Sequence, residues 1–577
     1  MKVEITKELL PLSMSLEGTE GTLTGKWGRL RPFLADRVAP CIDACPNRVP
    51  AAQFIKSLQQ GDLEGAWERI LEENCMPRVI GRVCFHPCEA QCNRGAFDET
   101  IAINALERVV GDEAFALGLR PQRLKEGRKE RMAVVGSGPA GLSCAYHLAR
   151  LGYEVTIFEA ASRLGGMLWS GIPEFRLPRK VLQEEIDVIL QMGIQAVTGV
   201  EVGRGRAFSA LLDEFDAAFY APGAQRGIPL HIPGAKSEGV FEGVDFLRAV
   251  HHGQAPEPGR RPLIIGGGNT ALDAARSVLR MGSRPVVIYR RSREEMPAFA
   301  DELAEAEEEG IEIMYLTSPR VIIEQEGRFI GLECQRNRLS DPGPDGRRRF
   351  VPVADSEFVL EGTSIIAAIG QNPELAGLPK GTTVRYAALE VDAGGRTGTP
   401  RLYAGGDAVD QPRSVVHAMA SGKRAAMAMD LARRQKGEEL PPEIRHWMER
   451  PPLSMARYLR GQTEDPGELV RPDQIRHEYF HEARRALPPR LHPEERSRSF
   501  REVTGPLPPE EASQEAERCF VCGICNTCGY CFLYCPDMAV ELDPAGMHIV
   551  IDYDHCKGCL VCLEECPRVA VAYEIKP

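Results

Sequence analysis

Short apolar runs, each followed by a helix-like stretch, recur through the middle of the chain. The runs 132–135 and 262–265 are continuously apolar, which is typical of strands buried on both faces, and each leads into a glycine-rich loop. Strand, loop and helix in that order predict parallel sheets covered by helices. In residues 1–125, amphipathic segments such as 51–58 and 64–71 instead predict a helical unit. The pattern therefore predicts a multidomain α/β protein with a helical N-terminal domain.

The first glycine-rich loop reads Gly-Ser-Gly-Pro-Ala-Gly over residues 136–141. In such a loop the first glycine permits the tight turn, the second lets the backbone approach a pyrophosphate, and the third lets helix and strand pack closely. The next strand, 154–158, ends on Glu159, where a carboxylate can accept a hydrogen bond from a ribose hydroxyl. Loop and context together predict a dinucleotide site.

A second loop, Gly-Gly-Gly-Asn-Thr-Ala, spans residues 266–271. The strand after it, 286–289, ends on Arg290 and Arg291 rather than on an acid. Two basic residues at this position favour the 2′-phosphate of NADP over NAD. The alternative is that both arginines are only a solvated strand end, which leaves the choice between NAD and NADP open.

A third segment, Leu-Tyr-Ala-Gly-Gly-Asp over residues 402–407, precedes a helix-like run from 414 to 429. The second Rossmann-like unit, residues 256–374, is thus nested in the first, which spans residues 126–255 and 375–435. This arrangement is typical of a flavoprotein that takes hydride from a nicotinamide. The acidic run 302–309 is interpreted as an exposed helix face.

The 18 cysteines cluster at short gaps, which in a long chain indicates metal ligands rather than disulfides. Two runs share the C-x2-C-x2-C-x3-C-P spacing of a bacterial ferredoxin: Cys525, Cys528, Cys531 and Cys535, then Cys556, Cys559, Cys562 and Cys566. A doubled run predicts two 4Fe-4S clusters in a ferredoxin-like α+β domain, residues 511–577, whereas zinc sites would show isolated pairs. Residues 436–510 are expected to form a linker that wraps over the body. Five N-terminal cysteines indicate at least one further cluster: Cys41, Cys45, Cys84, Cys88 and Cys92.

The length and net charge of the chain limit the number of domains and the kinds of partner that are expected. With 577 residues, roughly three to five domains are expected. A formal net charge of −12 argues against nucleic acid or anionic membrane as a partner. No apolar run reaches the roughly 18 residues of a membrane span, and the start lacks a signal-peptide layout, so a cytoplasmic protein is expected.

Several longer motifs resemble those of the glutamate synthase small-subunit family. They are residues 81–84 with 87–89, 165–168 leading to 171–178, 289–291 with 295–298, and 404–407. The resemblance covers roughly residues 35–430, and with the appended ferredoxin the layout is similar to the flavoprotein that accompanies dissimilatory sulfite reductase. In that family glutamate formation belongs to the large subunit. The chain is therefore not expected to be a glutamate synthase by itself.

The resemblance implies which residues bind the nucleotides. FAD would lie on Gly136, Gly138, Pro139, Ala140, Gly141, Glu159, Gly166, Arg176, Gly406, Asp407, Val415 and Val416. NADP or NAD would lie on Gly267, Gly268, Asn269, Thr270, Arg290, Arg291, Ala368, Ile369 and Gly370. No catalytic side chain is expected, because hydride transfer between two bound cofactors needs orientation more than an acid or a base.

The resemblance also implies one N-terminal cluster with a non-cysteine ligand. Its ligands would be Cys45, Cys84, Cys88 and Glu107, where relatives have a glutamine. The alternative is that Glu107 is an ordinary surface residue of a helix.

Cys41 and Cys92 then remain as half of a further cluster. The family's missing motif, Glu-Ala-x-Arg-Cys-x-x-Cys, occurs here at 515–522 instead. We hypothesise that Cys519 and Cys522 cross over to complete this cluster, in the same chain or across a dimer. The alternative is spare thiols or a zinc half-site. Cys75, Cys144 and Cys334 are expected to pack in cores.

The nucleotide units lack the cysteine pair that disulfide reductases place beside the flavin, so electrons must leave through the clusters. Three functions remain open. The chain could be an NAD(P)H oxidoreductase subunit that exchanges electrons with an iron-sulfur, molybdenum or tungsten partner in a hetero-oligomer or dimer. It could instead be a freestanding NAD(P)H:ferredoxin oxidoreductase, bifurcating or not. The third is a non-enzymatic redox sensor or scaffold.

Overall fold

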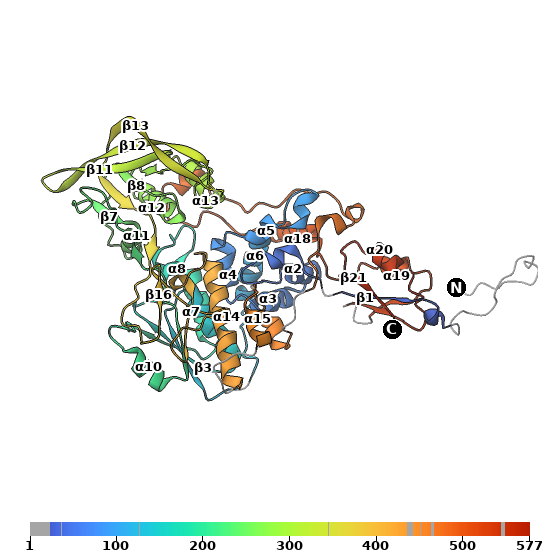
Figure 1. Ribbon diagram of the computed structural model, residues 1–577. Helices are drawn as coiled ribbons and strands as arrows, with labels where there is room; N and C mark the ends of the chain where they lie inside the picture. The colour runs from blue at the N-terminus through green and yellow to red at the C-terminus, as the bar shows by residue number, and fades with distance from the viewer. Residues whose placement is uncertain are drawn as a thin grey trace, which may run out of the picture.

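The computed structural model describes residues 23–35, 37–125, 127–343, 346–435, 442–450, 452–462, 467–543 and 548–576. Figure 1 shows a nucleotide-binding body, a helical unit beside it and a small lobe beyond the helical unit. The predicted multidomain α/β fold, with two nested Rossmann-like units, is confirmed. No helix among these residues is both long enough and apolar enough to cross a membrane.

The first parallel sheet of the body has the strand order β18-β5-β2-β3-β4. Its strands are β2 (Arg131–Val135), β3 (Glu154–Glu159), β4 (Gln195–Thr198), β5 (Ala217–Tyr220) and β18 (Leu402–Ala404). Helix α7 (Pro139–Arg150) follows the first glycine loop and packs against α14 (Val415–Gln435). Strand β18 and helix α14 follow the inserted unit in the sequence and complete the first unit.

The inserted unit has a second parallel sheet, ordered β10-β9-β8-β14-β7. Its strands are β7 (Val240–Glu242), β8 (Pro262–Ile265), β9 (Val286–Ile288), β10 (Glu312–Met314) and β14 (Ser364–Ala367). Helix α11 (Gly243–His251) follows β7, and α12 (Asn269–Arg280) follows the second glycine loop. An antiparallel sheet of long strands extends this unit: β11 (Thr317–Gln325), β12 (Arg328–Pro342) and β13 (Arg348–Glu361).

The helical unit consists of α1 (Pro40–Asp43), α2 (Ala51–Gln59), α3 (Leu63–Leu71), α4 (Pro77–Val83), α5 (Pro87–Ala90) and α6 (Ile103–Ala116). A buried ion pair joins this unit to the body. Lys423 of α14 contacts the Glu73 carboxylate, which also accepts a hydrogen bond of 2.9 Å from the Met455 amide. Because breaking such a buried pair is costly, this contact fixes three segments of the chain together.

The small lobe contains a strand from the N-terminal region. Strand β1 (Leu30–Leu34) pairs antiparallel with β21 (Val571–Ile575). The helical domain expected over residues 1–125 is present, but strand β1 within this range departs from it. The cause is pairing over a long sequence separation, which local periodicity does not report. The rest of the lobe comprises α19 (Tyr530–Leu533), β19 (Val540–Leu542), β20 (Ile549–Ile551) and α20 (Val561–Glu564).

The segment between body and lobe lies against both. Val503 of this segment contacts the body, since its N donates a 2.9 Å hydrogen bond to Phe175 O. Tyr479 of the same segment contacts the lobe, since its ring lies 4.4 Å from the ring of Tyr530. Its helices are α15 (Pro442–Met448), α16 (Met455–Leu459), α17 (Pro493–Arg496) and α18 (Pro509–Arg518).

The acidic run of residues 302–309 is only in part the exposed face that its charge suggested: Glu307 and Glu308 are exposed, whereas Glu305 and Glu309 are buried. It lies mainly on α13 (Ala300–Glu308), and the side chain of Glu309 is 0% exposed. Arg276 and Arg280 of α12 reach Glu309 at 2.8 and 2.7 Å. The prediction is wrong for the two buried carboxylates, because arginines on a neighbouring helix neutralise them and allow their burial.

Candidate nucleotide and iron-sulfur sites

One cavity of about 1280 Å³ is lined by both glycine-rich loops. It exceeds the roughly 300–1,000 Å³ typical of a pocket for one small ligand, and its size suits two nucleotides. The structure brings nearly all predicted nucleotide residues to its wall: Gly136, Gly138, Pro139, Ala140, Glu159, Gly166, Arg176, Gly267, Gly268, Asn269, Thr270, Arg290, Arg291, Ala368, Ile369, Gly370, Gly406, Asp407, Val415 and Val416. Gly141 does not line it.

The first loop has the geometry that a bound pyrophosphate requires. A Cβ on Gly138 would meet no atom within 4 Å, so the backbone is open toward the cavity. A Cβ on Gly141 would lie 1.9 Å from the Gly136 carbonyl oxygen, which explains why this glycine packs the helix onto the loop. The three glycines therefore divide into turn, opening and packing positions.

Two carboxylates mark the flavin side of the cavity. Glu159 ends β3 and accepts hydrogen bonds of 2.8 Å from Ser137 N and 2.9 Å from Ala161 N. Burial raises the pKa of Asp407, whose Oδ1 has no hydrogen-bond partner among the described residues. A buried acceptor without a partner fits a ligand hydroxyl, because leaving it unpaired is costly.

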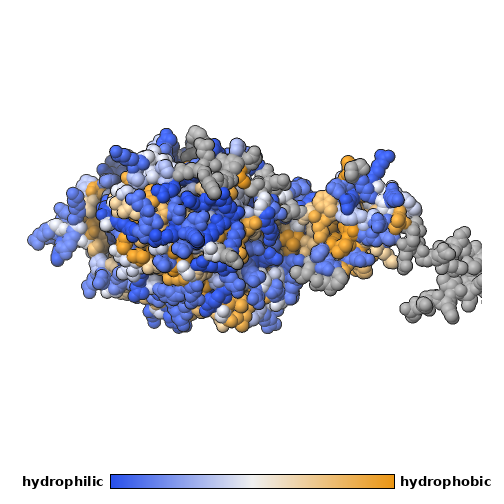
Figure 2. All heavy atoms as spheres, turned by 90° about the horizontal axis from the view of Figure 1, so that it is seen from below, coloured by the Kyte–Doolittle hydropathy of each residue, from blue (hydrophilic) through white to orange (hydrophobic). Residues whose placement is uncertain are grey.

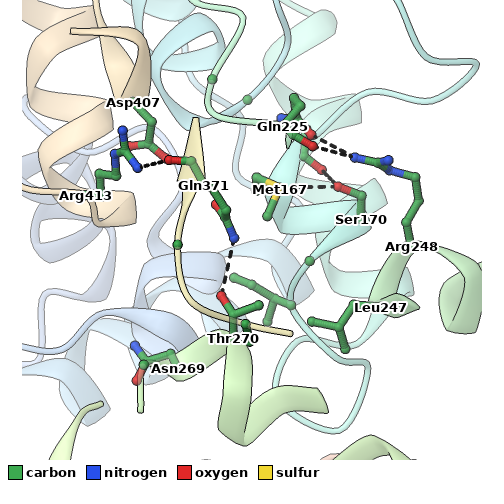
Figure 3. Close-up of a pocket in the computed structure, with 18 of the residues that line it drawn as sticks. Met167, Ser170, Gln225, Leu247, Arg248, Asn269, Thr270, Gln371, Asp407 and Arg413 are labelled. Carbon is green, nitrogen blue, oxygen red and sulfur yellow. Dashed lines mark hydrogen bonds between the residues drawn. The ribbon is translucent and has the colours of Figure 1, made fainter. Parts of the chain in front are cut away.

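Polar side chains without a motif complete the cavity wall (Figure 3). Arg413 donates to the Gln371 carbonyl, and Gln371 Nε2 donates to Thr270 Oγ1 at 3.4 Å. These two hydrogen bonds connect the segment just before α14 with the start of α12. Arg248 lines the cavity and contacts Gln225 at 3.4 Å. Sequence reasoning predicted Thr270, but it missed four residues that lie outside the glycine loops and that no local spacing marks: Gln225, Arg248, Gln371 and Arg413.

The nicotinamide side receives residues from the antiparallel sheet. The Arg290 guanidinium lies 5.0 Å from the centroid of the Phe350 ring, and Asn337 Nδ2 donates to Arg290 O at 3.0 Å. Arg290 and Arg291 both line the cavity. The two cations are thus positioned at the end of β9, where an anionic ribose phosphate can be bound.

Arg176 has a different environment from the other predicted FAD residues. It is almost fully buried, and its guanidinium pairs with Asp273 at 2.9 Å and with Glu302 at 2.7 Å. These carboxylates belong to the inserted unit. Arg176 therefore joins the two nucleotide units at the cavity wall.

A small buried cavity beside the main one is lined by Cys45, Cys84, Cys88 and Glu107. Glu107 is 5% exposed and accepts a 2.6 Å hydrogen bond from Asn74 Nδ2. Burial raises the pKa of its carboxyl to about 7. The alternative of an ordinary surface residue is wrong, because α6 turns this carboxyl toward the thiols.

The thiol cavity and the nucleotide cavity share a wall. Cys84 and Val416 line both. Next to Cys84, the ring of Phe85 stacks on Phe299 of the inserted unit at 5.1 Å and on His417 of α14 at 6.1 Å. The helical unit and both nucleotide units therefore meet at this point.

The structure also brings Cys41 and Cys92 together with Cys519 and Cys522, within one chain. Burial raises the pKa of Cys41 well above its ordinary value, and the thiols of Cys92, Cys519 and Cys522 add to the rise. Burial likewise raises the pKa of Cys522 to about 12, with Cys92 as a further cause. We call these four thiols the junction site.

Helix α18 delivers Cys519 to the junction site. Glu515 accepts a 2.7 Å hydrogen bond from Ala102 N, and Arg518 Nη2 donates to Glu99 O at 2.7 Å. Gln59 Nε2 of α2 donates to Ala516 O at 2.8 Å and to Cys519 O at 3.2 Å. These contacts hold the end of α18 against the helical unit.

The lobe cysteines form two groups, and the fourth cysteine of each sequence run belongs to the group of the other run: Cys566 joins Cys525, Cys528 and Cys531, and Cys535 joins Cys556, Cys559 and Cys562. Burial raises the pKa of Cys531 to about 12, with the thiols of Cys525, Cys528 and Cys566 as further causes. For Cys562 the pKa rises to about 11 through burial and the thiols of Cys556, Cys559 and Cys535. In two-cluster ferredoxins the fourth cysteine of each run likewise binds the other cluster. We call these groups the near and the far lobe sites.

Among the described residues, no three His, Cys, Asp or Glu side chains converge as ligands of a single metal ion. The cysteines outside the thiol groups, Cys75, Cys144 and Cys334, are buried at 3%, 0% and 0% exposure, as expected for core residues.

The fold and the cavity define an FAD- and NAD(P)-binding oxidoreductase. Residues 108–212 and 130–422 match the pyridine nucleotide-disulphide oxidoreductase family, and residues 34–119 match domain II of dihydropyrimidine dehydrogenase, a 4Fe-4S domain. The chain belongs to this oxidoreductase family. It uses FAD, NAD(P) and 4Fe-4S clusters for electron transfer.

Three relatives show which members of the family the chain resembles. The chain is 36% identical to the β subunit of NADP(+)-dependent formate dehydrogenase from Moorella thermoacetica, over 85% of this chain and 71% of that one. It is 37% identical to the β subunit of NADPH-Fe(3+) oxidoreductase from Geobacter sulfurreducens, over 68% and 63%. It is 33% identical to the glutamate synthase [NADPH] small chain of Halomonas elongata, over 67% and 86%. The resemblance to the glutamate synthase small subunit is thus confirmed.

Proposed function

We propose that the chain is a subunit that moves electrons between NADP(H) and an iron-sulfur, molybdenum or tungsten partner. When bound, FAD and the nicotinamide would supply hydride exchange, and 4Fe-4S clusters would supply single-electron transfer toward the lobe. Residues of the nucleotide cavity hold and orient the two nucleotides, and the thiol groups hold the clusters. The relatives named for NADP(+) and NADPH, together with Arg290 and Arg291, support NADP over NAD.

The observation that carries this proposal is the shared wall at Cys84 and Val416. It places the first thiol group directly beside the nucleotide cavity. From there the proposed order is the site of Cys45, Cys84, Cys88 and Glu107, then the junction site, then the near and far lobe sites. Cys41 supports the second step, because its thiol is an electrostatic neighbour of both Cys45 and the junction cysteines.

The lobe has the surface expected of the end that meets a partner. Cys528 and Cys559 are exposed there. Figure 2 shows apolar side chains gathered on the lobe, and its exposed residues include Leu533, Met538 and Ile575, at 71%, 81% and 74%. Exposed apolar groups near a redox site suit a protein partner.

Two measurements test the proposal. NADPH added anaerobically to the isolated protein should bleach the flavin within the mixing time, whereas a sensor or scaffold would leave it oxidised. Cys519→Ser should then slow electron transfer to an added low-potential acceptor while flavin bleaching stays at the wild-type rate. Loss of both activities would assign Cys519 a folding role instead.

A further inference from the structure

One guanidinium group lies between two of the thiol groups. Arg568 lines the small cavity that also contains the near lobe site, with Cys525, Cys528, Cys531 and Cys566. Its backbone carbonyl accepts a 2.7 Å hydrogen bond from Gly523 N, one residue beyond Cys522. Arg568 therefore belongs to the lobe and contacts the turn that carries Cys519 and Cys522 of the junction site.

The side chain of Arg568 extends toward the junction site. Its guanidinium lies 5.0 Å from the centroid of the Phe480 ring. Phe480 lies 4.4 Å from the ring of Phe520, which stands between Cys519 and Cys522 and is 1% exposed. Aromatic rings thus hold the cation in place from the junction side.

Thiols, rather than carboxylates, are the strongest electrostatic neighbours of this cation. Burial lowers the pKa of Arg568, and the thiols of Cys528, Cys519, Cys566 and Cys522 act in the opposite direction. Two of these belong to the near lobe site and two to the junction site. Its Nε is buried and has no hydrogen-bond partner among the described residues. An arginine remains charged in proteins, so this positive charge is available to both sites.

We propose that Arg568 is a positioning residue whose charge is shared by the clusters of the junction site and the near lobe site. This rests on the proposed function, because both sites must hold 4Fe-4S clusters. With clusters held by both sets of thiols, one electron passing from the junction site to the near lobe site would remove one negative charge from the first and add it to the second. A cation between them favours the reduced form of each. It therefore raises both potentials together and changes the driving force between them little.

The far lobe site offers a contrast. Lys557 is an electrostatic neighbour of Cys559 and Cys535 in that site, but it pairs with Asp537 at 2.8 Å, and the lysine side chain is 39% exposed. A cation that is paired and solvated influences its surroundings weakly. Lys557 is therefore a matched control for Arg568.

The test is a redox titration of the full-length protein with all clusters loaded, followed by electron paramagnetic resonance. In Arg568→Gln, the reduced-to-oxidised ratio of the junction and near lobe clusters at a fixed potential should fall about tenfold, equal to about 59 mV for one electron. The far lobe cluster should not move. Arg568→Lys should restore both potentials, and Lys557→Gln should leave them unchanged.

Unchanged potentials in an iron-replete Arg568→Gln protein would overturn the proposal. If that variant loses iron, the wild-type titration decides. A near lobe cluster that is reduced at higher potential than the far one supports the proposal, and equal or reversed potentials overturn it. A wild-type protein without a junction cluster would contradict the proposed electron path itself. Lower iron content and a missing resonance would distinguish that result from a failure of the Arg568 proposal alone.

Discussion

Each glycine-rich loop takes its site-forming residues from six consecutive positions, whereas the junction site draws its thiols from Cys41, Cys92, Cys519 and Cys522. The loops form wherever a strand, a turn and a helix follow one another. The junction forms only when α18 docks on the helical unit through Glu515, Arg518 and Gln59. Nucleotide binding and the proposed exit of electrons therefore depend on separable parts of the molecule.

The largest expected effect is a loss of stability on removing the Glu515 carboxylate, which holds α18 against the helical unit. Glu515 is 1% exposed and is bound by the Ala102 amide, the Ala486 amide and Arg518. Its replacement by alanine removes one of the two carboxylates that pair with Arg518, the other being Asp98 at 3.1 Å, and leaves the Ala102 and Ala486 amides without this acceptor. Unfolding should therefore become easier by about 2–4 kcal/mol. Chemical denaturation measures this loss, and the junction cluster should be lost with it.

Glu517→Ala is the control for this variant, because Glu517 lies on the same helix but is exposed. Its effect on stability should stay within about 0.5 kcal/mol. Equal stability of the Glu515 and Glu517 variants would show that α18 is not held by the buried carboxylate.

The next effect comes from breaking one local site. Gly138→Ala adds a methyl group into open space without backbone strain, so the fold should persist while flavin affinity falls about a hundredfold, or about 2.7 kcal/mol. Flavin absorbance per chain after gel filtration measures it. Gly268→Ala is the matched variant in the second loop, and it should retain flavin and weaken only NADPH binding. Retention of flavin in Gly138→Ala would contradict the role of this loop.

A smaller effect should sharpen the difference between the two loops. Removing Arg290 and Arg291 together should raise the KM for NADPH at least about tenfold, because even one charge-assisted hydrogen bond contributes about 1.5–3 kcal/mol. The KM for NADH should hardly change. Arg293→Ala is the control, since Arg293 pairs with Glu307 and does not line the cavity. An equal rise for both nucleotides would remove the argument for a 2′-phosphate site.

The local features were predictable from the sequence because short-range geometry determines them. The glycine loops, the nested parallel sheets and the ferredoxin spacing each follow from consecutive residues. Strand β1 and the buried Glu309 were not predictable, since each depends on a partner that is distant in sequence.

The junction site lies between these cases. Its two cysteines near residue 520 were found through a displaced family motif, but only the structure brings them to Cys41 and Cys92 in one chain. Arg568 carried no sequence signal. A single arginine after a Cys-Pro pair is unremarkable until the fold sets it beside two thiol groups.

Iron and sulfide per chain test the central claim most directly. Four 4Fe-4S clusters require about sixteen iron atoms in the wild-type protein and about twelve in a Cys519→Ser/Cys522→Ser variant. The variant should still be reduced by NADPH at its flavin. About twelve iron atoms in both proteins would contradict the crossover of Cys519 and Cys522, and with it the continuous path from the nucleotide cavity to the lobe.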